Sequence, residues 1–316
     1  MHTPKVSVLI PNYNYARFLP EAIDSVLEQE FVDFELVMVD NCSTDNSAQI
    51  MREYADRDPR IRVEFRPANT GMVANWNYCL SLARGDYAVL LLSDDKFAGP
   101  ETLGKLARML DTDRVAVMAV CARTVIDEAS HLVELRDHLG RSGHHSGQGL
   151  IAKCLREDRN LIGEPSVVMM RRAAASRGFN PGYRQLVDLE MWFHLLENGD
   201  AIYTTESLSL FRQHPLQESE TNRGRHVGER ELLRLLADYR DRPFLNFIAP
   251  YYLLFAHLNF LKRRGYADES TLELENELRQ SLGPLKFGWL SLRSRLVRPA
   301  ARLRRFWRKR VLGTRV

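Results

Sequence analysis

The chain has 316 residues, of which 45% are hydrophobic and 27% are charged, and its formal net charge is +3. This composition is typical of a folded globular protein and argues against an intrinsically disordered or fibrous chain. The four cysteines are scattered, which argues against a disulfide framework and a cysteine-rich metal site. The longest apolar stretches are too short or too polar to cross a bilayer, which argues against a membrane-spanning protein.

Strand-like and helix-like segments alternate through the first third of the chain. Continuous apolar runs at 6–10, 34–40 and 87–92, with a shorter run at 62–65, are typical of strands buried on both faces of a sheet. The segments between them place apolar residues at helical spacing. This order predicts an α/β fold with a mostly parallel central sheet flanked by helices. Because the first run begins almost at the start, we expect no signal peptide.

Polar residues directly follow three of these strands. They are Asn12, Asp40 and the run Ser93, Asp94 and Asp95. The carboxyl ends of parallel strands share one edge of the sheet, where such folds bind ligands. Adjacent carboxylates there suit Mg²⁺ or Mn²⁺ held against substrate phosphates, although an Asp-Asp turn that caps the next helix is the alternative. The dinucleotide and P-loop fingerprints are missing, which argues against a dehydrogenase and a P-loop enzyme.

Four blocks in chain order carry a family resemblance: VSVLIPNYN, VMVDNCSTD, NTGMVANWN and GDYAVLLLSDD. They resemble the successive motifs of glycosyltransferase family 2, which has the Rossmann-like GT-A fold, over roughly the first two-thirds of the chain. Leu92 stands where the family often has the first Asp of its acidic motif, and Asn41 stands where a second Asp is common.

The resemblance implies an inverting glycosyltransferase. It would move a sugar from a nucleotide-diphosphate donor (a UDP-, dTDP- or GDP-sugar) to a hydroxyl of a glycan or lipid-linked acceptor, with Mg²⁺ or Mn²⁺, in cell-surface polysaccharide biosynthesis. We expect a GT-A catalytic domain over 1–218, a helical extension over 219–290 and a basic amphipathic tail over 291–316.

The same resemblance assigns roles to individual residues. Metal binding falls to Asp94, Asp95 and His214. Donor binding falls to Pro11, Asn12, Tyr13, Asp40, Asn69, Gly71, Asn75, Ser93, Asp94 and Arg212. His214 and Arg212 end a predicted strand over 208–214, and a purely structural His214 is the alternative.

The general base of the family corresponds to Asp188, which precedes an apolar helical stripe. The alternative is a carboxylate that caps this helix and is favoured by its dipole. Glu190 is the substitute base, and Glu164, in the segment Gly163 to Ser166, is a second candidate on the acceptor side. A Gly-rich loop over 136–149 holds three histidines, and we interpret it as a mobile loop near the acceptor rather than a metal site.

Beyond residue 225 the pattern is helical. Residues 291–316 contain ten Lys or Arg and no Asp or Glu, which leaves 34 basic and 41 acidic residues, a net charge of −7, in the rest. Apolar residues of this tail share one helical face, which predicts an interfacial helix on an anionic membrane. Nucleic-acid contact, or packing against its own domain, are the alternatives. We expect a cytoplasmic protein on the inner face of the cell membrane.

Two rival functions need different features. A sugar-phosphate nucleotidyltransferase would need a Gly-rich, Arg-containing phosphate loop after the first strand, and PNYNYARF is not one. A basic-tailed nucleic-acid-binding module is disfavoured by the acidic body, so we expect no nucleic-acid partner.

Overall fold

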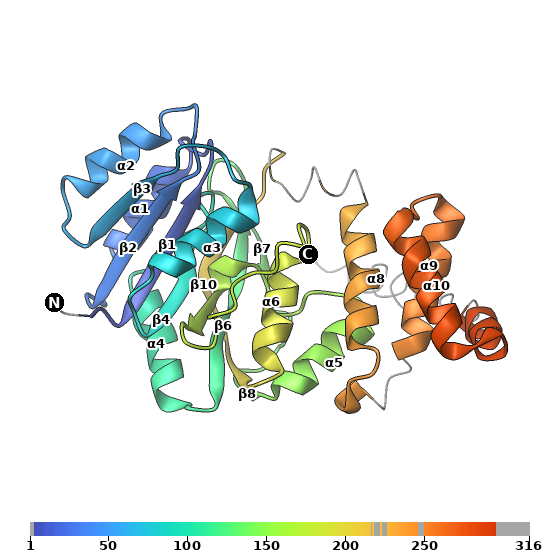
Figure 1. The fold of residues 1–316 in the computed structure, drawn as a ribbon. Helices are drawn as coiled ribbons and strands as arrows, with labels where there is room; N and C mark the ends of the chain where they lie inside the picture. The colour runs from blue at the N-terminus through green and yellow to red at the C-terminus, as the bar shows by residue number, and fades with distance from the viewer. Residues whose placement is uncertain (1–2, 216, 218–221, 223–225, 246–249, 295–316) are drawn as a thin grey trace. The chain divides into compact units, whose positions relative to one another are not determined.

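The structure is a computed structural model that describes residues 3–215, 217, 222, 226–245 and 250–294. The chain divides into two compact units. The first comprises Met1–Cys154 with Asp158–Glu220, and the second comprises Leu155–Glu157 with Thr221–Val316. The first unit contains the sheet, and the described part of the second contains helices (Figure 1).

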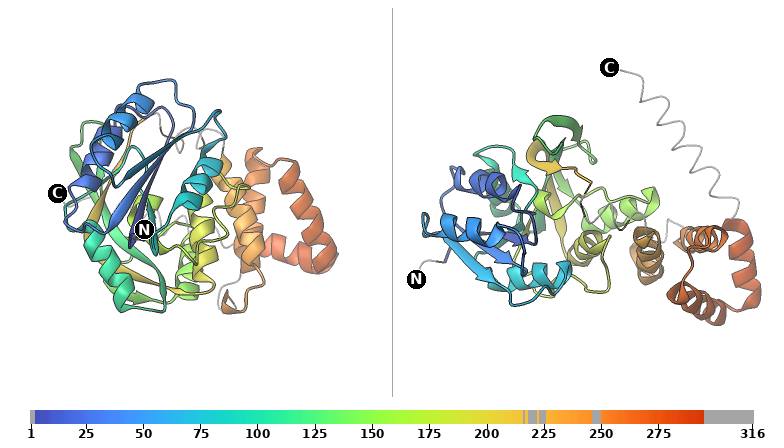
Figure 2. Two further views of the ribbon diagram at one scale, coloured as in Figure 1. Left: turned by 60° about the vertical axis from the view of Figure 1, so that its left-hand side comes forward. Right: turned by 90° about the horizontal axis from the view of Figure 1, so that it is seen from above.

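One mixed sheet forms the centre of the first unit. Its strands are β1 (Val6–Asn12), β2 (Phe34–Asp40), β3 (Ile61–Phe65), β4 (Tyr87–Leu90), β5 (Lys96–Phe97), β6 (Ala116–Ile126), β7 (Leu132–Arg136), β8 (Gly143–His145), β9 (Val168–Arg171) and β10 (Asp200–Arg212). The helices along this part of the chain are α1 (Leu19–Leu27), α2 (Ser47–Ala55), α3 (Met72–Leu82), α4 (Thr102–Thr112), α5 (Gly147–Glu157), the 3₁₀ turn η1 (Pro165–Val167) and α6 (Val187–Leu196). The last three residues of α5 belong to the second unit. Figure 2 shows helices on both sides of this sheet.

The strand order is β3-β2-β1-β4-β9-β6-β10-β5, with β7 paired to β6 and β8 paired to β10. The pairs β3-β2, β2-β1, β1-β4 and β6-β10 are parallel, which confirms the predicted parallel arrangement of the first four strands. β9 runs antiparallel to both of its neighbours. The reason is local: the loop before β9 lies at the carboxyl end of β4, where the Ser166 hydroxyl accepts a hydrogen bond from the Leu92 N–H at 3.1 Å, so β9 must run back along β4.

The centre of the sheet is buried and mostly apolar, and the buried Ser7 hydroxyl donates to the Glu35 carboxylate at 2.7 Å within it. Every residue of β1, β2 and β4 is buried, as the continuous apolar runs predicted. Burial of such side chains supplies the main driving force for folding and holds the strand ends at fixed positions. The polar residues that follow these strands therefore meet at a rigid edge.

The second unit contains α8 (Val227–Tyr239), the 3₁₀ turn η2 (Pro243–Leu245), α9 (Pro250–Arg264), α10 (Glu269–Leu282) and a helical stretch over 284–294. Asp268 caps α10, since its carboxylate accepts the Thr271 N–H at 3.0 Å. Phe255 and Phe287 pack edge to face with ring centroids 4.9 Å apart. Most of the predicted tail, residues 295–316, lies outside the described residues. Among the helices that the structure describes, none combines the length and the apolar character that a bilayer span requires.

Candidate functional site

The ends of β1 and β2 are joined by a buried polar network. Asn12 donates to the Asp40 carboxylate at 3.1 Å and to the Ser43 hydroxyl at 3.2 Å, and Asp40 accepts the Ser43 N–H at 2.9 Å. Asn12 and Asp40 are only 1% and 3% exposed. The structure thus brings these two predicted donor residues together, with both side chains fixed.

The turn before α3 lies beside this network. Asn69 accepts hydrogen bonds from the side-chain amide of Asn41 at 2.9 Å and from the N–H of Gly71 at 2.8 Å. Gly71 has φ of +86°, a conformation that favours glycine, although a β-carbon added there would meet no atom within 4 Å. Asn41, at the position where the family often has Asp, therefore orders the turn. Asn75 is buried, and its amide lies 3.5 Å from the Val39 carbonyl.

The acidic motif continues this edge beyond β4. Ser93 donates to the carbonyl of Pro11 at 2.7 Å, which ties the end of β4 to the end of β1. Asp94 and Asp95 are 8% and 1% exposed. Tyr13, by contrast, is 41% exposed. Pro11 and Ser93 therefore hold the strand ends together.

Both carboxylate oxygens of Asp95 have protein partners. One accepts the Ser166 hydroxyl at 2.5 Å and the other accepts the Arg212 N–H at 2.9 Å. Burial, and then the neighbouring charge of Asp94, raise the pKa of Asp95 well above its usual range. Asp95 therefore links β4, η1 and β10.

Asp94 faces a histidine instead. One of its carboxylate oxygens lies 3.1 Å from His214 Nε2 and accepts the Gln217 side-chain amide at 3.3 Å. The His214 ring packs against Tyr15 and Phe18, with centroids 5.6 and 5.0 Å away. The Asp94 carboxylate oxygen is the type of ligand that Mn²⁺ and Mg²⁺ prefer, and the imidazole nitrogen beside it offers a second ligand atom. No group of three His, Cys, Asp or Glu side chains in the described part of the chain is arranged as a metal site, so substrate phosphates would have to complete the ligand set.

Arg212 is fully buried and bonds to protein groups. Its guanidinium donates to the Asp94 carbonyl at 2.8 Å, to the Asp127 carbonyl at 3.0 Å and to the Glu21 carboxylate at 3.1 Å. Desolvation raises the pKa of Glu21, but hydrogen bonds from Lys96 and Ser130 and the charge of Arg212 outweigh it and lower the pKa to about 2. Arg212, which the family resemblance assigns to donor binding, thus holds the backbone of the acidic motif in position.

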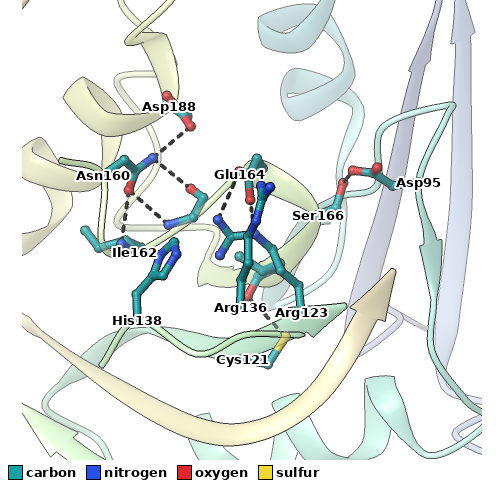
Figure 3. Close-up of polar contacts among 12 residues, drawn as sticks. Asp95, Cys121, Arg123, Arg136, His138, Asn160, Ile162, Glu164, Ser166 and Asp188 are labelled. Carbon is teal, nitrogen blue, oxygen red and sulfur yellow. Dashed lines mark hydrogen bonds and ion pairs between the residues drawn. The ribbon is translucent and has the colours of Figure 1, made fainter. Parts of the chain in front are cut away.

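Asp188 lies in the first turn of α6 and faces Asn160 (Figure 3). One carboxylate oxygen accepts the Leu189 N–H at 2.7 Å, and the other accepts the Asn160 side-chain amide at 3.1 Å. Desolvation raises the pKa of Asp188 to about 7, the Leu189 N–H opposes this, and the charge of Glu164 adds to it. The residue that precedes the helix is Leu186, whose side chain makes no cap, so Asp188 is not the N-cap residue.

Figure 3 shows Glu164 between Asp188 and Asp95, and the charge of Glu164 contributes to the raised pKa of both. Its carboxylate pairs with the buried guanidinium of Arg123, with an N–O distance of 2.5 Å (Figure 3). Gly163 precedes it with φ of +128°, and its carbonyl accepts the Trp192 indole N–H at 2.9 Å. We call Asp94, Asp95, Glu164 and Asp188 the acidic cluster.

Glu190 belongs to a different contact. It forms two hydrogen bonds with Arg177, at 2.8 and 2.6 Å, and is 8% exposed. Two residues along a helix is more than half a turn, so Glu190 and Asp188 point to different sides of α6. Its position suits a structural ion pair.

The three loop histidines occupy separate places. Residues 143–145 form β8, so the expected irregular loop contains a strand. His144 lies between Asp113 and Asp200, at 2.6 and 2.8 Å, and these hydrogen bonds raise its pKa. His138 accepts a hydrogen bond from Arg159, and burial followed by the charge of Arg123 lowers the pKa of His138 to about 3.

Sequence reasoning missed three residues that hold the site together. Ser166 bonds Asp95, Asn160 bonds Asp188, and Gln217 bonds Asp94. Asn160 also accepts the N–H groups of Ile162 and Gly163, each at 3.0 Å. Ser166 stood in a segment that the sequence had singled out. The other two had no signal, because Asn and Gln are common in loops.

The comparison with protein families finds a match over residues 7–179 to the model "Glycosyl transferase family 2". An uncharacterized protein of Mycobacterium tuberculosis is 30% identical over 246 residues, which are 75% of this chain and 72% of that protein. A Bacillus subtilis protein provisionally named teichuronic acid biosynthesis glycosyltransferase TuaG is 28% identical, over 66% of this chain and 79% of its own.

Solved structures show the same fold at low identity. S. aureus TarS in complex with UDP has a TM-score of 0.61 and 20% identity, over 81% of this chain and 71% of that chain. The mannosyltransferase PcManGT of Pyrobaculum calidifontis, solved with GDP-Man and Mn²⁺, has a TM-score of 0.58 and 18% identity, over 98% and 89% of the two chains. These likenesses establish the fold, a mixed sheet flanked by helices.

Proposed function

Because this chain belongs to glycosyl transferase family 2, we propose that it transfers a sugar from a nucleotide-diphosphate donor to an acceptor hydroxyl, with inversion at the anomeric carbon, and that Asp188 is the general base. The observation that carries the assignment of the base is the state of its carboxyl group. Asp188 is held by two hydrogen bonds and has a pKa of about 7, which suits proton transfer near neutral pH.

The donor would lie along the carboxyl edge of β1, β2 and β4. Asp40, Asn12 and Asn69 are fixed there by hydrogen bonds, which places polar groups for a base and ribose. Pro11, Ser93 and Asn75 help to hold this edge in place, since Ser93 donates to the Pro11 carbonyl and Asn75 to the Val39 carbonyl. The exposed Tyr13 is free to contact the donor. TarS and PcManGT were solved with UDP and GDP-Man, which supports a nucleotide donor without selecting the base.

We assign Asp94 and His214 to a divalent cation, either Mg²⁺ or Mn²⁺. Their facing oxygen and nitrogen atoms support this pairing, whereas both oxygens of Asp95 already serve Ser166 and Arg212. When bound, the cation would neutralise negative charge on the leaving nucleotide diphosphate. Arg212 would act by holding the Asp94 backbone and the neighbouring loop in place.

The reaction would then follow from the positions of the side chains. Asp188 accepts the proton of the acceptor hydroxyl while that oxygen forms a bond to the anomeric carbon. The bond from this carbon to the diphosphate oxygen breaks on the opposite face, and the configuration inverts. Asn160 holds the carboxylate of Asp188 in orientation, and Glu164 opposes its loss of a proton through its negative charge.

We further propose a glycan or lipid-linked acceptor in cell-surface polysaccharide synthesis, at the cytoplasmic face of the membrane. The name of TuaG supports the polysaccharide class, and the basic residues over 291–316 support attraction to anionic lipid. A lipid-linked acceptor would confine enzyme and substrate to one plane.

A donor screen tests the proposed function. The full chain is incubated with UDP-, dTDP- and GDP-sugars, Mn²⁺ or Mg²⁺, and alkyl glycosides as acceptors, and released nucleotide diphosphate is measured. We expect release from one class of donor that depends on an acceptor and stops with EDTA. Absence of release from every donor, by protein that remains folded, would contradict the proposal.

A further inference from the structure

The helical stretch over 284–294 has two apolar faces, and only one of them is buried. Phe287, Leu290 and Ser294 are 5%, 4% and 1% exposed. Leu285, Trp289 and Leu292 are 89%, 51% and 62% exposed. A helix turns 100° per residue, so the second set lies within an arc of about 60° on the side opposite the first.

Cations and aromatic rings border this exposed stripe. The Arg293 guanidinium lies 4.9 Å from the centroid of the Trp289 ring and 5.5 Å from that of Tyr252. The Lys286 ammonium lies 5.9 Å from the Tyr251 centroid. Tyrosine and tryptophan rings next to cations are typical of protein surfaces at the boundary between lipid headgroups and acyl chains.

The charge of this part of the chain has one sign. From residue 284 to residue 316 the sequence contains eleven Lys or Arg and no Asp or Glu. A protein surface that combines exposed leucines, a half-exposed tryptophan and neighbouring cations is complementary to an anionic lipid surface, which offers both negative headgroups and apolar depth. The carboxylate of Asp241 also borders it and accepts the Tyr251 hydroxyl at 2.8 Å.

We propose that the face formed by Leu285, Trp289 and Leu292, with Lys286 and Arg293 beside it, is a docking surface for an anionic membrane. This assigns membrane contact to a folded helix, in addition to the basic residues that follow it. The inference rests on the proposed function only in that a lipid-linked acceptor would make this location useful.

The first test replaces two leucines in the full chain. Leu285→Gln combined with Leu292→Gln should weaken binding to phosphatidylcholine vesicles that contain phosphatidylglycerol by about tenfold, because less apolar surface leaves water. Leu272→Gln is the matched control, since Leu272 is also exposed, at 48%, but lies on α10. Equal binding by the double variant and the unaltered chain would overturn the proposal. Dimerisation that the double variant abolishes, with vesicle binding unchanged, would assign the face to a second copy and also overturn it.

The second test locates Trp289. A Trp307→Phe variant leaves Trp289 with Trp76 and Trp192, which are only 7% and 0% exposed. Changes in tryptophan fluorescence on vesicle binding should therefore come mainly from Trp289. We expect its emission to shift to the blue on anionic vesicles. Pelleting with the vesicles without any shift would overturn the proposal. A donor-binding measurement without vesicles separates the lipid surface from the proposed sugar transfer. If the unaltered chain binds no nucleotide sugar but gives the expected results in both vesicle tests, the proposed function is wrong and the lipid surface is supported.

Discussion

Two opposing effects act on the carboxyl group of Asp188. Its place in the first turn of α6 favours the ionised form, an effect of about 0.3–1 kcal/mol at a helix N-terminus. Desolvation favours the neutral form and, with the charge of Glu164, moves the pKa from 3.8 to about 7. That change corresponds to roughly 4 kcal/mol, so desolvation outweighs the helix dipole. A carboxyl group in this state is a stronger base than an ordinary aspartate.

The raised pKa predicts that Asp188 limits stability. The contribution of such a group to stability is fully present below its unfolded pKa of 3.8, falls as pH rises above that value, and is lost once pH has risen through about 7. Asp188→Asn should therefore increase the free energy of unfolding at pH 8 by about 1–3 kcal/mol relative to the unaltered protein, and raise the melting temperature accordingly. At pH 5 both increases should be much smaller. Calorimetric melting curves at both pH values measure this. If the variant gains more stability at pH 5 than at pH 8, ionisation of the Asp188 carboxyl group does not destabilise the folded protein.

Glu190 provides the matched comparison on the same helix. Glu190→Gln weakens the two hydrogen bonds to Arg177 and should lower stability by about 1–2 kcal/mol at both pH values. The catalytic rate of the Glu190→Gln variant, and the pH dependence of that rate, should remain close to those of the unaltered enzyme. A rate loss comparable to that of Asp188→Asn would return Glu190 to the acceptor side.

At the scale of elements, the loop over 163–167 connects the two halves of the site. It carries Glu164 beside Asp188 and Ser166 beside Asp95, and then continues into β9. Gly163 makes this path possible, because its φ of +128° is rarely adopted by other residues. The geometry of this loop therefore determines how far apart the carboxylates of the acidic cluster lie.

Gly163→Ala tests the role of this loop. The added carbon would lie 2.6 Å from Val167 Cγ2 and 3.0 Å from the Arg123 guanidinium, so we expect a loss of stability of about 2–4 kcal/mol. Gly140→Ala is the control, since Gly140 has φ of +67° and open space at the same position, and should cost about 1 kcal/mol. Urea denaturation compares the two variants. Equal losses would mean that backbone strain alone, and not the packing of Arg123 and Val167, constrains the loop.

The sequence predicted elements whose pattern is regular. The runs that became β1, β2 and β4 are continuous and fully buried, so their ends could be placed and the edge of the sheet inferred. β10 was predicted only from residue 208, although it begins at Asp200, because register shifts around Thr204 and Ser207 interrupt its pattern. The direction of β9 could not be predicted, since burial does not encode strand direction.

The same limit applies to the site. Asp94, His214 and Asp188 could be predicted as site residues because their motifs resemble a family. The full burial of Arg212 was not predicted, since charged side chains are normally exposed and its acceptors, at Glu21, Asp94 and Asp127, are far apart in sequence. Asn160 likewise reaches Asp188 across 28 residues.

At the scale of the whole molecule, the first unit contains both the edge proposed for the donor and the proposed base, while the second unit contains the proposed lipid surface. Metal use tests the donor half of this division. Asp94→Asn and His214→Ala should each weaken donor binding in the presence of Mn²⁺ by about tenfold or more, and EDTA should do the same to the unaltered chain. Isothermal calorimetry measures this. Tight donor binding that survives both substitutions and EDTA would remove the metal from the account.

The proposed role of Asp188 is that of the base in a sugar transfer. It is tested most directly by the rate of transfer as a function of pH, for the unaltered chain and for Asp188→Asn, with the donor found in the screen. We predict a rate that rises with pH through about 7, a loss of roughly 10²–10⁴-fold in the variant, and nearly unchanged donor affinity. A variant that transfers sugar at the unaltered rate would contradict the account and make Glu164 the next candidate.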